Sequence, residues 1–120
     1  MILTEWTYEF TPEAEKDLSK LDGSQRKIVI KAIEKVVKNP LPRTEGGLGE
    51  PLGNKFGYDL TGYNKIKLKG QNLRIVYCLI NERMVMQNIA IAERSDQEVY
   101  KAAYNRIKKV KFDALRGVFY

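Results

Sequence analysis

The sequence predicts a small α+β protein, and three observations support this prediction. Apolar residues recur at helical spacing in two successive stretches near the start of the chain. Two strand-like runs then lie close together between residues 65 and 80, and a third run leads directly into another helical pattern. This order predicts a small antiparallel β-sheet with an N-terminal helical hairpin packed on one face and a C-terminal helix.

The N-terminal part is predicted to contain one strand and two helices. Residues 5–10 alternate as a short strand, with three aromatic side chains on one side. Thr11 and Pro12 fit the N-cap and the first position of a helix. Ser24 can cap a second helix, which an Asn-Pro pair at residues 39–40 ends. The two amphipathic helices in succession indicate a helical hairpin that covers one sheet face.

Residues 41–62 are rich in proline and glycine and show no sustained period. Three of the glycines, Gly46, Gly47 and Gly49, invite comparison with a phosphate-binding loop. No Gly-Lys-Ser/Thr sequence follows them and no strand precedes them, so the segment is predicted to be a plain loop.

A β-hairpin is predicted after this loop. Residues 65–69 alternate lysine with isoleucine or leucine, which is typical of a half-buried strand with its lysines exposed. Gly70 and Gln71 fit a two-residue turn, and residues 73–80 form a dense β-branched and aromatic run.

This hairpin register brings cations together on one face of the sheet, which we expect to be uncovered. It places Lys67 directly opposite Arg74, with Lys65 two residues away on the same face. Like charges placed opposite each other destabilise a sheet, unless an anion lies over them. The alternative interpretation is that exposed lysines only discourage edge-to-edge aggregation.

The C-terminal part is predicted to place two more polar residues near a sheet end. Residues 84–92 have the composition of a strand, and residues 95–98 (Ser-Asp-Gln-Glu) fit the capping box of a helix. Arg94 then lies at the junction between strand and helix, and Tyr100 lies in the second helical turn. A strand-to-helix junction is a suitable place to present a guanidinium group.

Composition and charge restrict the class of protein. The chain has 120 residues, which is the usual length of one globular domain, and it contains no histidine. Its net charge of +6 favours a polyanionic partner. The single cysteine, Cys78, lies in an apolar run and is expected to be a buried thiol. The sequence shows neither a signal-peptide pattern nor a membrane span, so we expect a cytoplasmic protein.

An ordered set of motifs resembles the RelE/ParE toxin superfamily, and within it the RelE-type mRNA interferases. The matching segments are residues 9–14 (Glu-Phe-Thr-Pro-Glu-Ala), 65–68 (Lys-Ile-Lys-Leu), 73–77 (Leu-Arg-Ile-Val-Tyr) and 94–100 (Arg-Ser-Asp-Gln-Glu-Val-Tyr). The resemblance extends over residues 8–107 and needs no insertion between 65 and 100. It implies a RelE-like fold and the toxin of a type II toxin-antitoxin system.

The resemblance also implies an activity: a ribosome-dependent endoribonuclease that cleaves mRNA through the RNA's own 2′-hydroxyl, without a metal or cofactor. Lys65 and Lys67 would serve as base and charge stabilisers, and Arg74 would hold phosphate. Arg94 would steady the transition state, and Tyr100 would orient or stack the substrate. The implied partners are a cognate antitoxin, the ribosome and the mRNA in its A site.

Several alternatives remain open at this point. The residues do not decide which lysine is the base, although neighbouring cations and partial burial are expected to lower the pKa of Lys67. Glu93 is a rival base, and Tyr100 could simply pack on the helix's own apolar face. A ParE-like toxin that binds DNA gyrase without cutting nucleic acid is the alternative function.

The last residues form a distinct segment. We expect a single RelE-like toxin domain over residues 1–120, with 108–120 as a basic and apolar C-terminal extension. This extension is interpreted as a packed helical continuation, a nucleic-acid contact, or a surface that a partner protein covers.

Overall fold

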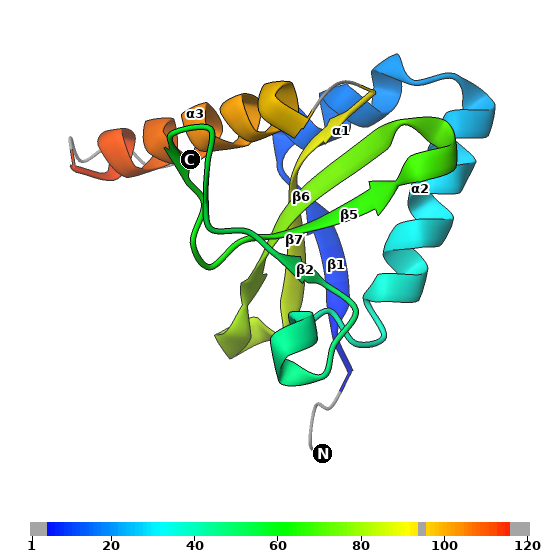
Figure 1. Ribbon diagram of the computed structural model, residues 1–120, viewed down its shortest axis with the longest axis horizontal. Helices are drawn as coiled ribbons and strands as arrows, with labels where there is room; N and C mark the ends of the chain where they lie inside the picture. Colours follow the sequence, from blue (N-terminus) through cyan, green and yellow to red (C-terminus); the bar gives the residue numbers. More distant parts are fainter. Residues whose placement is uncertain (1–4, 94–95, 116–120) are drawn as a thin grey trace.

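The computed structural model describes residues 5–93 and 96–115, with only the backbone given for residues 55 and 111–115 (Figure 1). A five-stranded sheet, ordered β1-β7-β6-β5-β2, lies at its centre, and β3 and β4 form a separate small hairpin. The bounds are β1 (Thr7–Phe10), α1 (Pro12–Lys20), α2 (Gly23–Val36), β2 (Glu50–Pro51), β3 (Asn54–Lys55), β4 (Tyr58–Asp59), β5 (Asn64–Leu68), β6 (Leu73–Ile80), β7 (Val85–Ala92) and α3 (Asp96–Leu115).

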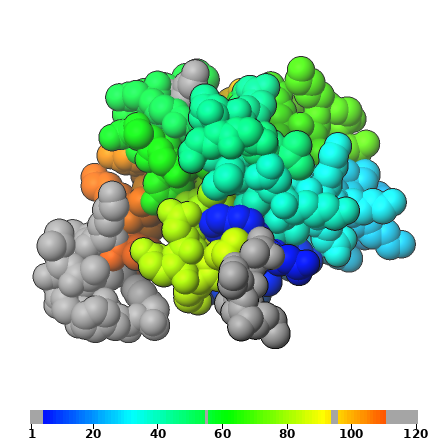
Figure 2. Space-filling model, turned by 90° about the horizontal axis from the view of Figure 1, so that it is seen from below, coloured from blue at the N-terminus to red at the C-terminus, as the bar shows by residue number. Residues whose placement is uncertain are grey.

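The sheet confirms the predicted α+β class. Strands β2, β5, β6 and β7 pair antiparallel, while β1 adds to the edge of the sheet in parallel with β7. At one end of the molecule the start of β1 lies beside the turn that joins β6 to β7 (Figure 2). There the amide of Thr7 donates to the carbonyl oxygen of Met84 at 3.0 Å.

One face of the sheet is covered by the predicted helical hairpin. Because side chains alternate along a strand, Ile66, Ile75 and Tyr77 all point to this face. They form one core cluster with Val29 and Ile33 of α2. Burial of this apolar area gives the hairpin its place on the sheet.

The opposite face is not uncovered as the sequence predicted, because α3 crosses it. Val76 and Ala90 from the sheet pack there against Val99, Tyr100 and Ala103 of α3, and all five are buried. The apolar face of α3 therefore packs on the side of the sheet that carries the cations. The first turn of α3 therefore lies over the strands that carry the lysines.

The register of the β5–β6 hairpin is confirmed. Lys67 lies opposite Arg74, and Leu68 lies opposite Leu73. The connection is longer than the two-residue turn predicted, since residues 69–71 form a 3-10 turn and Asn72 closes it at φ 53°. Asparagine tolerates this left-handed conformation better than most residues.

The helix starts are set by side-chain caps. The hydroxyl of Thr11 accepts from the amide of Ala14, as predicted. The second helix begins two residues earlier than predicted, because Asp22 and Gln25 form a reciprocal capping box and Ser24 lies inside the helix. Across the described residues, no helix combines the length and apolar character that a membrane span needs.

The segment 41–62 contains more structure than the plain loop that was predicted. β2 pairs with β5 and so extends the main sheet next to Lys65. The β3–β4 hairpin turns through Phe56 and Gly57, both at positive φ. Strands of two residues are too short for periodicity to reveal, which is why the sequence did not predict them.

A partly buried ion pair fastens α3 to the rest of the fold. Both terminal nitrogens of Arg106 contact the carboxylate of Asp17 on α1, at 2.6 and 3.0 Å. Arg106 also donates to the carbonyl oxygen of Ile89, and Asp17 accepts from the amide of Ile91. Helices α1 and α3, on different faces, are thus tied to one strand, β7.

We expect Asp17→Ala to lower the free energy of unfolding by about 2 kcal/mol, because it leaves a mostly buried guanidinium and an amide without their acceptor. Chemical denaturation measures this change. Glu15→Ala, an exposed position on the same helix, is the matched control, and equal losses for both variants would show that the pair does not fasten α3.

Candidate active site

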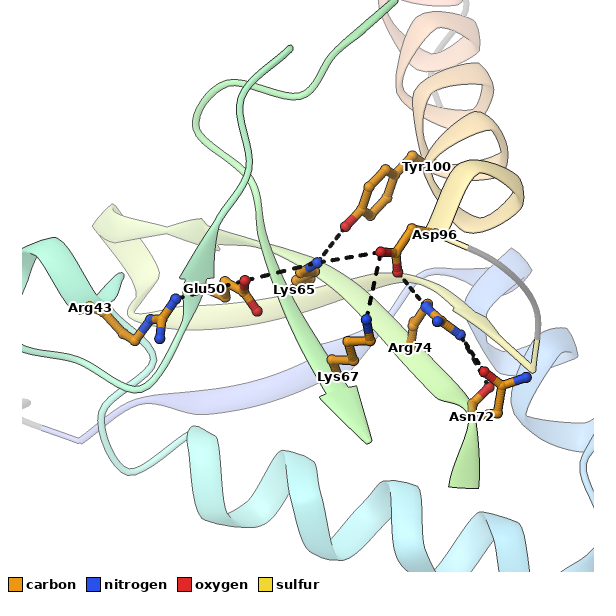
Figure 3. Close-up of polar contacts among 8 residues, drawn as sticks. All are labelled: Arg43, Glu50, Lys65, Lys67, Asn72, Arg74, Asp96 and Tyr100. Atoms are coloured by element: carbon orange, nitrogen blue, oxygen red, sulfur yellow. Dashed lines mark hydrogen bonds and ion pairs between the residues drawn. The ribbon is translucent and has the colours of Figure 1, made fainter. Parts of the chain in front are cut away.

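Charged and polar side chains converge where the first turn of α3 lies over the β5–β6 hairpin (Figure 3). Lys65 and Lys67 come from β5, Arg74 from β6, and Asp96 and Tyr100 from α3. Four of the five predicted site residues are therefore brought together. The fifth, Arg94, lies outside the described residues, and so does Ser95 of the predicted capping box.

Asp96 lies at the centre of the cluster. Its Oδ1 accepts a short hydrogen bond from Nε of Arg74, and its Oδ2 lies 3.8 Å from the Nζ atoms of both Lys65 and Lys67. The carboxylate offsets the repulsion between the cross-strand cations Lys67 and Arg74. The sequence had not placed Asp96 in the site.

The guanidinium of Arg74 is held from two sides. Its Nη1 donates to the side-chain oxygen of Asn72 at 2.9 Å, while its Nε donates to the carboxylate of Asp96. Asn72 can reach back in this way because it adopts the left-handed conformation that closes the hairpin turn. The turn thus fixes the orientation of a side chain that is only 11% exposed.

Tyr100 joins the core to the site, and its packing on the apolar face of α3 is confirmed. Its ring is buried in the α3 cluster, and its hydroxyl oxygen accepts a hydrogen bond from Nζ of Lys65 at 2.7 Å. The same Nζ lies 5.5 Å from the ring centroid, within cation–π range. Tyr100 therefore fixes the position of Lys65.

The ammonium group of Lys65 faces two carboxylates as well as the hydroxyl of Tyr100. Burial alone would lower its pKa, but the hydrogen bond to Tyr100 and the charges of Asp96 and Glu50 together raise it above the ordinary lysine value. Neither carboxylate could be placed beside Lys65 from the sequence alone. Lys65 is consequently a firmly protonated ammonium group at neutral pH.

The other members of the cluster titrate consistently with this picture. Burial alone would raise the pKa of Asp96, yet its bond to Arg74 and the nearby ammonium groups lower it below the usual carboxyl value. Burial raises the pKa of the Tyr100 hydroxyl, against the opposing effect of Lys65. At neutral pH the site therefore holds an ionised Asp96, a charged Lys65 and a neutral Tyr100.

Glu50 and Arg43 extend the site on the side away from α3. Glu50 on β2 lies 3.9 Å from Lys65 and 3.7 Å from Arg43. Beside them is an open pocket of about 440 Å³, lined by Arg43, Leu48, Glu50, Lys65, Ile66, Lys67 and Lys69. The sequence gave no signal for this contribution, because Glu50 lies in the segment that was predicted to be a loop.

An exposed aromatic ring lies beside Tyr100. Phe56, at the tip of the β3–β4 hairpin, is 58% exposed, and its ring centroid is 6.1 Å from that of Tyr100. The ring of Tyr58 on the same hairpin packs against Tyr104 of α3 at 5.4 Å. The hairpin is thereby fixed beside the site.

The described residues offer little support for metal or thiol chemistry. Among them, no group of three His, Cys, Asp or Glu side chains is arranged to bind a metal ion. Cys78 is half-buried, rather than fully buried as expected, and burial followed by the charge of Glu9 raises the pKa of its thiol to about 11. It therefore stays a protonated, weakly reactive thiol.

The fold and the cluster together define a small basic α+β protein in which three cationic side chains surround one carboxylate. No protein-family model matches the chain. The mRNA interferase toxin RelE of Escherichia coli K12 is 29% identical over 99 residues, which is 82% of this chain and 94% of the relative. The mRNA interferase RelE of Shigella flexneri matches with the same identity and coverage.

Solved structures agree with these relatives. A mutant of the E. coli toxin RelE in the free state superimposes with a TM-score of 0.67 at 26% identity, covering 86% of this chain and 98% of RelE. The same mutant in complex with an antitoxin RelB peptide gives a TM-score of 0.61 at 27% identity, with 82% and 94% covered. In sequence and in fold the chain is thus similar to RelE toxins.

We expect Tyr100→Phe to lower the pKa of Lys65, because phenylalanine fills the core but cannot accept the ammonium hydrogen bond. NMR titration of the lysine side chains measures this pKa directly. Tyr104→Phe on the same helix is the control and should leave it unchanged. A Lys65 pKa that stays at its wild-type value in Tyr100→Phe would mean that the hydroxyl does not hold the proton on Lys65.

Proposed function

We propose that this protein is the toxin of a type II toxin-antitoxin system and an endoribonuclease that cleaves mRNA. The observation that carries the proposal is the convergence of Lys65, Lys67, Arg74 and Tyr100 over one sheet face, in a chain that resembles RelE along most of its length. The curated relatives are mRNA interferases, which is the activity this cluster is suited to perform.

The chemistry requires charge and proton transfer, which cationic side chains can supply. The RNA's 2′-hydroxyl attacks the adjacent phosphorus, the bond to the 5′ oxygen breaks, and a 2′,3′-cyclic phosphate remains. A base must take the hydroxyl proton, positive charge must stabilise the phosphorane, and an acid must protonate the 5′ oxygen. Histidine often fills the proton-transfer roles, but the chain has none.

The geometry supports a division of labour between the two lysines. Lys65 donates to Tyr100 and is held protonated, so it suits charge stabilisation. Lys67 has no such hydroxyl partner among the described residues and is the better candidate for the base. Its side chain is 31% exposed, compared with 11% for Lys65, so a substrate can reach it.

Three further residues complete the proposed catalytic set. Arg74 binds the phosphate, because a guanidinium presents several donors in a fixed fork. Tyr100 positions Lys65 and orients the substrate. Arg94, two residues before the start of α3 in the sequence, is assigned transition-state stabilisation from the family resemblance.

The proposed substrate is mRNA in the ribosomal A site, so the protein would act in the cytoplasm. A cluster whose cations are largely paired has little charge left for an unstructured strand. A host that bends the RNA into line would supply part of the orientation that the protein lacks. Dependence of cleavage on the ribosome follows from this argument.

We expect Lys67→Ala to lower mRNA cleavage at least about tenfold without unfolding the protein, because lost transition-state charge is costly and truncation of an exposed side chain is not. Single-turnover cleavage on programmed ribosomes measures the effect, alongside the melting temperature. Lys31→Ala, an exposed lysine on α2, is the control for net charge.

The same experiment can be extended to cells to separate nuclease activity from an action on DNA gyrase. After induction, translation should stop and new mRNA 3′ ends should carry cyclic phosphates, while plasmid supercoiling stays unchanged. Full cleavage by a folded Lys67→Ala variant would remove Lys67 from the catalytic set. Altered supercoiling with intact mRNA would contradict the nuclease proposal altogether.

The proposed partner is a cognate antitoxin, because a RelE neighbour is bound to an antitoxin RelB peptide in its solved structure. The end of α3 is a suitable anchor. The helix continues through residue 115, and Lys108, Lys109 and Val110 are exposed, with Val110 58% exposed. Alternating cations and apolar groups fit an acidic, amphipathic segment.

We expect truncation after Ile107 to weaken antitoxin binding at least about tenfold, the loss that corresponds to roughly 1.4 kcal/mol of buried contacts. Titration of the purified antitoxin at two salt concentrations measures it, and the melting temperature of the truncated chain controls for folding. Equal affinity for the full and truncated chains would exclude residues 108–120 as the anchor.

A further inference from the structure

The carboxylate of Asp96 occupies a position with the recognition chemistry of a phosphodiester. One of its oxygens accepts from the guanidinium of Arg74, and the other faces the ammonium groups of Lys65 and Lys67 (Figure 3). A phosphodiester also carries one negative charge and two non-bridging oxygens. The same three cations therefore match either group, but one group at a time.

The arrangement leaves little cationic surface for an incoming phosphate. The side chains of Arg74 and Lys65 are each only 11% exposed, while Asp96 is 28% exposed. Glu50 lies 3.9 Å from Lys65 on the other side, so that lysine faces two carboxylates. A phosphate gains full contact with these cations only when Asp96 turns away from them.

We propose that Asp96 is a specificity-determining residue: it fills the phosphate position in the free protein, so that only RNA presented with additional binding energy displaces it. This inference rests on the proposed function and extends it. Free single-stranded RNA must compete with an anion that is permanently attached to the site. RNA that is held by the ribosome is already oriented, so its binding energy is sufficient to displace Asp96.

Population arithmetic gives the size of the effect. When the binding-competent state is only a fraction of the molecules, the apparent dissociation constant rises by the inverse of that fraction. If Asp96 leaves the cations in about one molecule in ten, affinity for free RNA falls about tenfold. Removing the charge of Asp96 should therefore raise the affinity for free RNA about tenfold.

A rival role for Asp96 as the general base makes the opposite prediction. A base must hold a proton readily near neutral pH, yet the contacts to Arg74 and the lysines lower the pKa of Asp96. The carboxylate is thus a poor proton acceptor in the observed arrangement. Neutralising a base abolishes cleavage, whereas neutralising a competing anion increases it.

The test compares Asp96→Asn with Glu82→Gln. Each variant raises the net charge by one, but Glu82 lies in the turn beyond the end of β6 that is farthest from Arg74. The probe is a single-stranded RNA with 2′-O-methyl groups, which presents phosphates but cannot be cleaved. We expect Asp96→Asn to bind it about tenfold more tightly than wild type and Glu82→Gln to bind it nearly as wild type does.

Cleavage of unmodified free RNA gives the second readout, in which Asp96→Asn should be faster than wild type. Equal affinities of the two variants, or slower cleavage by a folded Asp96→Asn, would overturn the proposal. Because the first probe is not cleaved, a protein without nuclease activity would still show the affinity difference. Failure of the proposed function and failure of this inference are therefore distinguishable.

A measurement on the wild-type protein covers the case in which Asp96→Asn does not fold. Inorganic pyrophosphate is added while the carboxyl carbon of Asp96 and the Nε–H of Arg74 are followed by NMR. If pyrophosphate displaces Asp96, the Asp96 signal should move toward the chemical shift of a solvent-exposed carboxylate while the Nε–H signal of Arg74 also shifts. A saturating response of Arg74 with an unchanged Asp96 signal would contradict displacement.

Discussion

The ion pair between Asp96 and Arg74 is the interaction on which the arrangement of the site depends. Two strands bring cations to one sheet face, and their mutual repulsion would oppose this geometry without an anion among them. Asp96, at the first turn of α3, supplies that anion. The pairing therefore stabilises the site and also sets the position of the helix start, which carries Tyr100 close to Lys65.

The position of α3 connects the core to the chemistry. Val99, Tyr100 and Ala103 bury one face of the helix against the sheet, and the Asp17–Arg106 pair fastens it farther along. Tyr100 belongs to both regions, since its ring packs in the core and its hydroxyl contacts the site. A change in helix position would thus alter the proton affinity of Lys65, and a partner that moves α3 would act directly on the site.

Local patterns predicted much of this structure. Alternation at residues 65–69 gave the correct strand and placed Lys67 opposite Arg74, and the Thr11 cap was read correctly. What failed depends on contacts distant in sequence. The carboxylates of Asp96 and Glu50 approach Lys65 only after α3 and β2 are in place, so the raised pKa of Lys65 could not be predicted from the sequence. No spacing rule could have supplied that information.

The central claim is that the cluster around Asp96 is where the protein meets RNA phosphate. NMR of the lysine ammonium groups tests it most directly, with a non-cleavable 2′-O-methyl RNA added to the wild-type protein. The account predicts that the Nζ signals of Lys65 and Lys67 shift together and saturate, while that of Lys31 on α2 does not. Saturable shifts confined to lysines away from the cluster, with Lys65 and Lys67 unchanged, would contradict it.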